Sequence, residues 1–281
     1  MRYGLPYKGS KNKIAEWIIS HLPPASHFYD LFAGGCAVSH AAILSRKYNV
    51  VHINDKKKEI VDFFVSAIEQ KLPDGWMNAV SREEFRLMDK NDPLRLIWSF
   101  GNNVRSYIYG DKEKVKLNAH KMIVSDSISE RYQAYKEFIR ELESIRELES
   151  IQRIQSIERI NGLNLLRHFD VKIETSFMDY QEVSILPESV VYADPPYRGT
   201  EGYVSAFDFD RFDAWLRRAP FPVYVSEYRM PPDFICIDEV KKTCAFSPSR
   251  SNKPVVERLF LHERWAHHAK PGEQELPLVF D

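Results

Sequence analysis

The chain has 281 residues, of which 44% are hydrophobic and 28% are charged. This length is enough to bury one large core, or one core with an inserted second domain. The 39 lysines and arginines nearly balance the 40 aspartates and glutamates, so the formal net charge of -1 does not by itself indicate a polyanion-binding protein. Three scattered cysteines without a CxxC pair indicate neither a disulfide framework nor a zinc site.

The sequence also shows no sign of export or of a membrane span. No apolar signal-peptide core is present at the N-terminus, and no apolar run approaches the roughly 20 residues of a membrane-spanning helix. We therefore expect a protein of the reducing cytoplasm, associated with nucleoid or phage DNA if it acts on DNA. His267 and His268 have no further ligand at metal-site spacing, so we expect no bound metal.

The first segment of interest is basic and aromatic. Residues 6–11 read Pro-Tyr-Lys-Gly-Ser-Lys and precede an amphipathic helix predicted over residues 14–19. The ring of Tyr7 and the ammonium group of Lys11 would suit one side of a charged ligand. A mobile basic N-terminus is the alternative interpretation.

A strand and a glycine turn follow. Residues 27–36 predict a short apolar strand that ends in Phe-Ala-Gly-Gly-Cys, and residues 37–44 predict the next helix. This geometry brings the backbone close to a nucleotide-like ligand. Asp55 ends the next predicted strand, 20 residues after Gly35, the spacing at which a carboxylate meets ribose hydroxyls. Because the turn lacks the GxGxxG pattern, a dinucleotide cofactor is disfavoured; a turn that merely links strand and helix is the alternative.

Residues 194–197 read Asp-Pro-Pro-Tyr and follow the apolar run 190–193, which predicts a buried strand. Ligands of open α/β sheets bind at the edge where such strands end. Asp194 can accept hydrogen bonds from an amino group, the prolines stiffen the turn, and Tyr197 offers a flat face to a planar ring. The segment therefore predicts a clamp for a planar amine such as that of a nucleobase, with an ordinary Asp-Pro turn as the alternative.

In this order, the segments 7–11, 30–35, 54–55 and 194–197 resemble the Dam-like (D12 class) DNA adenine methyltransferases of phage or prophage type. The resemblance covers residues 3–65 and 188–262. It implies an α/β, Rossmann-like methyltransferase fold with a mostly parallel seven-stranded sheet and an inserted, mainly helical target-recognition domain. Cys36 departs from the family, which usually has a small residue, often glycine, there; we interpret it as a packing residue.

The resemblance also implies S-adenosylmethionine as the cofactor and methyl transfer to the N6 amino group of adenine in double-stranded DNA. The target base would be flipped out of the duplex, since the pocket cannot reach it there. The catalytic residues implied are Asp194, Pro195, Pro196 and Tyr197. The cofactor-binding residues implied are Tyr7, Lys11, Asp30, Phe32, Gly34, Gly35, Asp55 and Asp194.

The stretch between Asp55 and Asp194 is too long for one crossover connection, which indicates an insertion. We predict a catalytic domain over residues 1–70 and 165–270, an inserted target-recognition domain over 71–164, and a tail over 271–281.

Residues 99–121 of the insertion combine basic, amide and aromatic side chains. Lysine and arginine suit phosphates, asparagine and arginine can read base edges, and a tyrosine can fill the gap left by a flipped base. A solvated loop with a tyrosine packed below it is the alternative. The candidate DNA contacts are Asn102, Asn103, Arg105, Tyr107, Tyr109, Lys112 and Lys116.

Residues 140–163 repeat every six residues, with an apolar residue at every third position. A spacing of three does not match the 3.6 residues of an α-helical turn, so the apolar stripe would wind around a helix. Helix-forming residues and the absence of proline favour a helix, while a short solenoid of turns is the alternative. We predict an arm that sets how the recognition segment meets DNA; a simple packing element is equally compatible.

The remaining sequence predicts a helix over 210–218 and strands over 222–226 and 255–261. The loop between 198 and 209 would close over a flipped base, with Tyr203 as a candidate contact. The segment 247–253 is a candidate phosphate contact or a plain hairpin loop. The tail 275–280 is similar to the Gln-Leu-x-Leu-x-Phe tails that bind the bacterial sliding clamp, with a tail packed on its own domain as the alternative.

Other functions stay open at this point. One alternative is a DNA-binding module that has lost catalysis. All four segments are intact here, which argues against it. Related enzymes that methylate the amino group of cytosine or of protein glutamine more often carry serine or asparagine at the position of Asp194. A nicotinamide-dependent dehydrogenase would need the absent glycine pattern. The target sequence, and the existence of a companion restriction enzyme, are not indicated.

Overall fold

The computed structural model describes residues 2–99, 105–108, 113–141, 149–198, 207–242 and 255–269. The chain divides into two compact units. The helical unit comprises Met1–Lys13, Gly34–Ala37 and Lys57–His168, and the sheet unit comprises Ile14–Ala33, Val38–Lys56 and Phe169–Asp281. The helical unit thus contains the predicted insertion together with two short segments from nearer the N-terminus. Among the described helices, none is long and apolar enough to cross a membrane.

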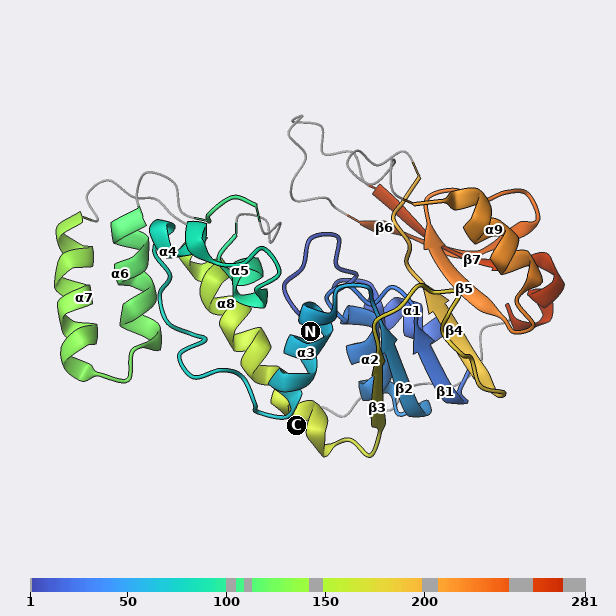
Figure 1. Cartoon of the computed structure of the whole chain (residues 1–281), viewed down its shortest axis with the longest axis horizontal. Helices are drawn as coiled ribbons and strands as arrows, with labels where there is room; N and C mark the ends of the chain where they lie inside the picture. The colour runs from blue at the N-terminus through green and yellow to red at the C-terminus, as the bar shows by residue number, and fades with distance from the viewer. Residues whose placement is uncertain are drawn as a thin grey trace. The chain divides into compact units, whose positions relative to one another are not determined.

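The sheet unit is built on seven strands in the order β3-β2-β1-β4-β5-β7-β6 (Figure 1). Strands β1 to β5 pair in parallel, and β7 runs antiparallel to both β5 and β6. This topology confirms the predicted α/β fold with a mostly parallel seven-stranded sheet. The strands are β1 (Ala25–Asp30), β2 (Tyr48–Asn54), β3 (Lys172–Ser176), β4 (Ser189–Ala193), β5 (Val223–Glu227), β6 (Phe234–Lys242) and β7 (Val255–His262).

The central strands are apolar and buried, which is why the sequence predicts them. Every residue of β4 and β5 is buried, as expected of parallel strands covered on both faces. The strand order reverses between β1 and β4, where Asp30 pairs with Tyr192. Such a reversal is the switch point at which open α/β sheets bind ligands.

Three α-helices belong largely to the sheet unit: α1 (Ala15–His21), α2 (Ala37–Ser45) and α9 (Phe209–Arg218). All three were predicted from the sequence within one or two residues. The start of α9 is capped by Asp208, whose side chain accepts a hydrogen bond from the N–H of Arg211. Phe212 and Leu216 of α9 lie in the same core cluster as Val191 and Val225 of the sheet. The 3₁₀-helix η4 (Glu263–His268) follows β7.

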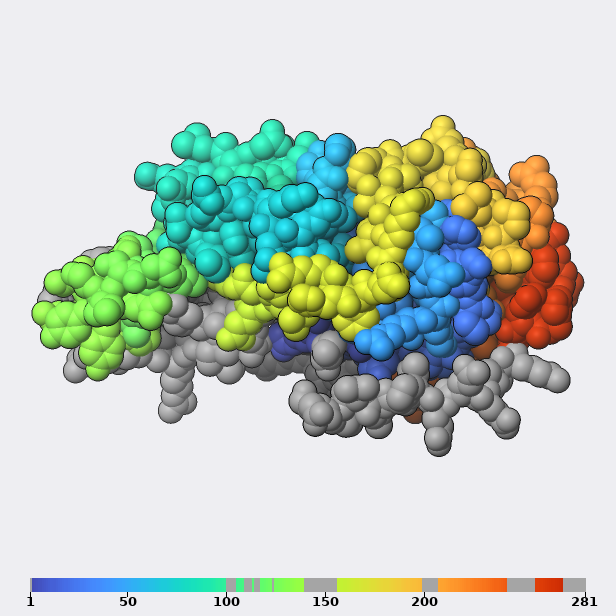
Figure 2. All heavy atoms as spheres, turned by 90° about the horizontal axis from the view of Figure 1, so that it is seen from below, coloured from blue at the N-terminus to red at the C-terminus, as the bar shows by residue number. Residues whose placement is uncertain are grey.

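The helical unit contains α3 (Lys58–Ile68), α4 (Arg82–Leu87), α5 (Pro93–Ile97), α6 (Glu113–Val124), α7 (Ile128–Glu141), α8 (Glu149–Gly162) and the 3₁₀-helix η3 (Leu163–His168). Local signals explain several of these helix starts. Ser81 and Glu84 form a reciprocal capping box at α4, and Asp92 caps α5 ahead of Pro93. On α7, whose surface is bright green in Figure 2, Ile128, Tyr132 and Tyr135 are exposed.

The six-residue repeat is helical over its described part, which confirms the favoured interpretation. Residues 149–162 form α8, while residues 142–148 lie outside the described residues. Buried apolar residues recur every three positions at Ile157, Ile160, Leu163 and Leu166. The α-helix gives way to the 3₁₀-helix η3 at Leu163. Because a 3₁₀-helix has three residues per turn, this change keeps Leu163 and Leu166 on one face.

Candidate active site

The carboxyl ends of four neighbouring strands meet at one edge of the sheet unit. Asp30 is the last residue of β1 and pairs with Ile53 on one side and Tyr192 on the other. Asp55 directly follows β2, and Asp194 directly follows β4. Three of the predicted carboxylates therefore lie at the switch point.

The charges of the other two carboxylates act on Asp30. Burial raises the pKa of Asp30 to about 7, the hydrogen bond from Ser39 opposes this rise, and the charges of Asp194 and Asp55 add to it. The hydroxyl of Ser39 donates to Asp30 Oδ2 at 2.7 Å. Its other oxygen, Oδ1, is buried and accepts no hydrogen bond from the described residues. A buried acceptor without a donor is costly, so this edge has capacity for a hydrogen-bonding ligand.

Asn54 holds three of these strand ends together. Its Nδ2 donates to the carbonyl oxygens of Leu31, after β1, at 3.0 Å and of Met178, after β3, at 3.1 Å. Its Oδ1 accepts from the hydroxyl of Ser176 at 2.8 Å and from the N–H of Met178. The loop positions on either side of β2 are thereby fixed through a single buried amide.

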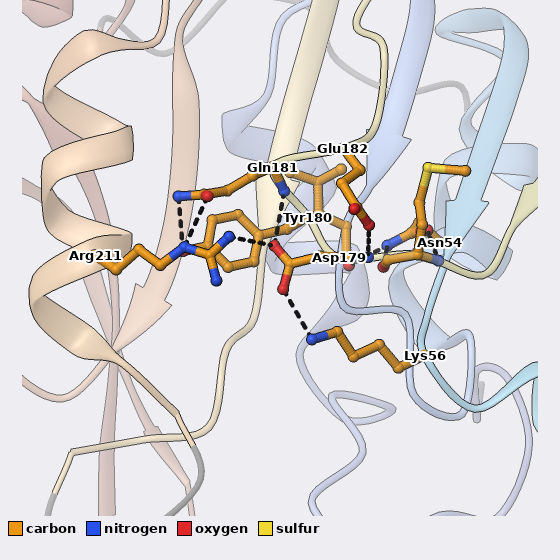
Figure 3. Close-up of polar contacts among 9 residues, drawn as sticks. Asn54, Lys56, Asp179, Tyr180, Gln181, Glu182 and Arg211 are labelled. Carbon is orange, nitrogen blue, oxygen red and sulfur yellow. Dashed lines mark hydrogen bonds and ion pairs between the residues drawn. The ribbon is translucent and has the colours of Figure 1, made fainter.

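The loop after β3 is fixed by a second polar network (Figure 3). Asp179 Oδ2 accepts from Lys56 Nζ at 2.8 Å, and Asp179 Oδ1 accepts from the N–H of Gln181 at 3.1 Å. Arg211 of α9 donates from Nε to Gln181 Oε1 at 2.8 Å, and the N–H of Asp179 donates to Glu182. Although burial opposes it, the hydrogen bond from Lys56 and the other donors hold the pKa of Asp179 below its ordinary value. The sequence analysis did not identify this loop, because β3 lacks an apolar pattern.

The Asp-Pro-Pro-Tyr segment leaves the end of β4 without regular secondary structure, and Pro195 is buried. The Tyr197 hydroxyl donates to Glu257 Oε2 at 2.7 Å, and its ring lies 4.5 Å from that of Tyr228 at an interplanar angle of 85°. The N–H of Arg198 donates to Glu227 Oε2 at 3.1 Å. Two carboxylates from other strands therefore hold the clamp, one through the phenol and one through the main chain.

Phe32 belongs to an aromatic cluster in the sheet unit. Its ring packs against those of Tyr180, Phe207 and Phe212, at centroid distances of 5.4, 5.8 and 5.9 Å. The ring is partly buried rather than enclosed, so part of it remains accessible.

The glycine turn lies against the N-terminal segment within the helical unit. The N–H of Leu5 donates to the carbonyl of Gly35 at 2.7 Å. Gly34 has φ +48°, and a Cβ atom there would lie 3.4 Å from the ring of Tyr7; at Gly35 it would lie 2.6 Å from Tyr7 Cβ. Lys57 Nζ contacts the Tyr7 hydroxyl at 2.9 Å, and Lys11 is buried. Glycine is therefore required where the tyrosine approaches the turn.

The family model of the D12 class N6 adenine-specific DNA methyltransferases matches residues 7–98. Over this segment, which is about a third of the chain, the sequence is similar to that family. The match includes the glycine turn and Asp55, whereas residues 194–197 lie beyond it. The match supports the predicted type of enzyme, a DNA adenine methyltransferase.

Similar solved structures include two of the rRNA methyltransferase aviRa from Streptomyces viridochromogenes. One is 10% identical with a TM-score of 0.35, covering 93% of this chain and 87% of that chain. The other is 11% identical with a TM-score of 0.34, covering 92% and 86%. No curated protein sequence matches this chain.

The candidate DNA contacts are only partly described. Arg105 is exposed. The Tyr107 hydroxyl donates to the carbonyl of Val80 at 2.6 Å, and its ring packs 5.4 Å from that of Phe85. This placement matches the alternative in which a tyrosine packs beneath the loop. Asn102, Asn103, Tyr109, Lys112, the side chain of Lys116, the loop residue Tyr203, the segment 247–253 and the tail 275–280 lie outside the described residues.

Three residues of the site were not assigned a role from the sequence: Asn54, Glu227 and Glu257. Each is a buried polar side chain in an apolar strand: Asn54 and Glu227 are the last residues of β2 and β5, and Glu257 is the third residue of β7. That position is the available signal, because a buried carboxylate or amide needs a specific partner. Their partners are distant in sequence, at separations of 124, 29 and 60 residues, so the pairing itself could not be predicted.

Proposed function

We propose that this protein transfers the methyl group of S-adenosylmethionine to the N6 amino group of adenine at a specific site in double-stranded DNA. The observation that carries the proposal is Asp194 at the switch point, directly after β4 and electrostatically coupled to Asp30. The family-model match over residues 7–98 supports the reaction class, and the Asp-Pro-Pro-Tyr segment supports the amine substrate.

The residues present fit the cofactor. Within the helical unit, glycine at positions 34 and 35 lets Tyr7 lie close to the turn, and Lys11 follows Tyr7 in the N-terminal segment. Within the sheet unit, the unsatisfied oxygen of Asp30 and the carboxylate of Asp55 suit amino and hydroxyl donors. We propose that Asp30, Phe32, Asp55 and Asp194 of the sheet unit bind S-adenosylmethionine. For Tyr7, Lys11, Gly34 and Gly35 of the helical unit, we propose the same role from the resemblance of their segments to the family. When bound, this cofactor supplies an electrophilic methyl group.

The protein's own contribution is to hold the amine. Asp194 would accept a hydrogen bond from the N6 amino group, and the carbonyl of Pro195 would accept the other. These two acceptors orient both N–H bonds of the amino group. The lone pair of the nitrogen then points away from them and can react. Tyr197 would stack on the flipped base, which the loss of duplex stacking makes necessary. Positioning and electrostatics therefore account for the proposed rate enhancement.

Adenine is favoured over the other amine substrates by the carboxylate at position 194. A cytosine or glutamine amino group would be held by the same geometry, and a degenerate DNA-binding module would keep the fold. The three alternatives predict different products: methylated cytosine, methylated protein, or no methylated product.

The test is methyl transfer from S-adenosylmethionine carrying a tritiated methyl group to DNA from a host without adenine methylation. Asp194→Ala is compared with Asp62→Ala, a partly exposed aspartate paired with Lys58 on α3. We expect label in N6-methyladenine with the unchanged protein and with Asp62→Ala, and a loss of about 100-fold or more with Asp194→Ala. Mapping the modified positions then gives the target sequence.

Other products would contradict the proposal in distinct ways. Label in N4-methylcytosine would reassign the base, and label in protein would reassign the substrate class. DNA binding without transfer, in protein shown by calorimetry to bind the cofactor, would indicate a degenerate binding module. Equal transfer by Asp194→Ala would remove the proposed role of the clamp.

The tail 275–280 is proposed as a sliding-clamp peptide on its sequence alone. An extended apolar peptide can add to a preformed groove of a partner. We expect a synthetic peptide of residues 271–281 to bind the bacterial clamp, and a version with alanine at Leu278 and Phe280 not to bind. Equal affinity of both peptides would contradict this interaction.

A further inference from the structure

The hydroxyl of Tyr197 is held by a buried carboxylate from strand β7. Glu257 lies in β7, is 4% exposed, and accepts from the Tyr197 hydroxyl at 2.7 Å. The two residues are 60 positions apart. Burial, reinforced by the charges of Asp194 and Glu257, raises the pKa of Tyr197 well above its ordinary value. The phenol is therefore protonated near neutral pH and acts as the donor.

A second contact restrains the same ring from the side. The rings of Tyr197 and Tyr228 lie nearly perpendicular at 4.5 Å, the edge-to-face arrangement that aromatic pairs favour. Tyr228 is itself fixed, because its N–H donates to Glu227 Oε1 at 2.7 Å and its carbonyl accepts from Arg258 Nη1 at 2.8 Å. Arg258 directly follows Glu257 in β7, so the two contacts share one strand.

The main chain is restrained as well. Glu227 Oε2 accepts from the N–H of Arg198, the residue after Tyr197, at 3.1 Å. A ring held at its para position, against a second ring and at its backbone can rotate little about χ1 and χ2. Its orientation is thus set before any base arrives.

The chemistry of position 257 supports a role beyond sheet stability. Glu257 pairs with Val240 of β6, and an apolar side chain would satisfy a buried strand position at lower cost. Burying a carboxylate is expensive unless it is hydrogen-bonded to a suitable donor. In this site the donor is the aromatic residue of the amine clamp.

We infer that Glu257 is a positioning residue that fixes the ring of Tyr197 for stacking on the flipped adenine. This inference rests on the proposed function. Glu257 itself touches neither base nor cofactor in this role and acts through Tyr197. Its effect should therefore fall on kcat, because ring orientation governs alignment of the bound base, and not on the KM for S-adenosylmethionine.

The experiment is a double-mutant cycle in the full chain, with Tyr197→Phe, Glu257→Gln and the double variant. Tyr197→Phe keeps the stacking ring and removes the donor. Glu257→Gln keeps the size and an acceptor oxygen but removes the charge. Glu263→Gln, an exposed glutamate just after β7, makes the same substitution outside the site. We measure kcat and the KM for S-adenosylmethionine on a DNA duplex carrying the mapped target site. Thermal unfolding of each protein variant is measured separately.

We expect Tyr197→Phe to lower kcat about tenfold, the order for one hydrogen bond to a charged group, and Glu257→Gln to lower it less because the amide oxygen still accepts. The double variant should be no worse than Tyr197→Phe, and KM for the cofactor should change less than about twofold. Glu263→Gln should match the unchanged protein. Coupled losses of this kind identify a shared function of the two side chains.

Two results would overturn the inference while leaving the proposed function intact. One is independent losses that multiply in the double variant. The other is a lowered unfolding temperature with unchanged kcat, which would assign Glu257 to sheet stability. If Glu257→Gln does not fold, a Tyr197→Phe protein with unchanged kcat decides against the inference by itself. Absence of adenine methylation by the unchanged protein would instead overturn the proposed function, and this role with it.

Discussion

At the scale of single residues, Asp30 gives the active-site edge a pH-dependent effect on stability. Its raised pKa means that the folded state keeps a proton that the unfolded state releases between pH 3.8 and about 7. Stability from this group is complete below pH 3.8 and is lost as the pH rises through about 7. The protein therefore tolerates an unfavourable carboxylate at neutral pH, which is common where a carboxylate serves a ligand.

Replacing this carboxylate should change the pH dependence of stability in a defined direction. Asp30→Asn keeps an acceptor for the Ser39 hydroxyl and removes the titration. We expect the variant to gain stability relative to the unchanged protein as the pH rises from 4 to 7, by at most about 1.4 kcal/mol per pH unit. Urea unfolding at several pH values measures the difference. A constant difference across this range would show that Asp30 does not titrate there.

At the scale of elements, the repeat-derived helix α8 is held by the residues that face inward. Ile160 is fully buried, while Leu165 in the following 3₁₀-helix is 62% exposed. We expect Ile160→Ala to lower the free energy of unfolding by about 2–5 kcal/mol, because it leaves a cavity, and Leu165→Ala to change it by less than about 0.5 kcal/mol. Chemical denaturation of both variants tests this, and equal losses would contradict the observed burial.

The elements also show where sequence reasoning reaches its limit. Strands β1, β2, β4, β5 and β7 were predicted because they are apolar and central, whereas β3 and β6 were missed. Both missed strands are at sheet edges, where polar side chains face solvent and the apolar pattern fades. The site residues were likewise predicted only in part. Asp30, Asp55 and Asp194 were predicted because each ends a recognisable strand, but Glu257 reaches Tyr197 only through the antiparallel pairing of β7.

At the scale of the whole molecule, a second titrating group, His52, gives stability a pH dependence of opposite sign to that from Asp30. Burial lowers the pKa of His52 from 6.5; Glu174 opposes this shift, while His27 and Lys172 add to it. His52 Nε2 lies 3.0 Å from His27 Nδ1, and its ring stacks on Tyr29 at 3.9 Å. The stability due to neutral His52 is present above pH 6.5 and is lost as the pH falls below it. The two groups therefore give slopes of opposite sign that overlap in mildly acidic solution.

Removing the histidine should make this balance visible. We expect His52→Asn to lose some stability at pH 7.5, through the lost stacking, but to lose less than the unchanged protein when the pH is lowered from 6.5 to 5. Thermal unfolding of both proteins across this range measures the slopes. Parallel curves would mean that protonation of His52 does not oppose folding.

The position of β7 has a consequence for how the protein is made. Among the strands that the structure describes, β7 comes last in sequence, yet it lies between β5 and β6 in the sheet. Until residues 255–262 leave the ribosome, the fully buried strand β5 has an unpaired edge, and such edges promote association with other chains. The same late residues bring Glu257 to Tyr197. Completion of the sheet and completion of the amine clamp thus both wait for β7, and a nascent chain that stops before β7 is both aggregation-prone and unable to orient its clamp tyrosine.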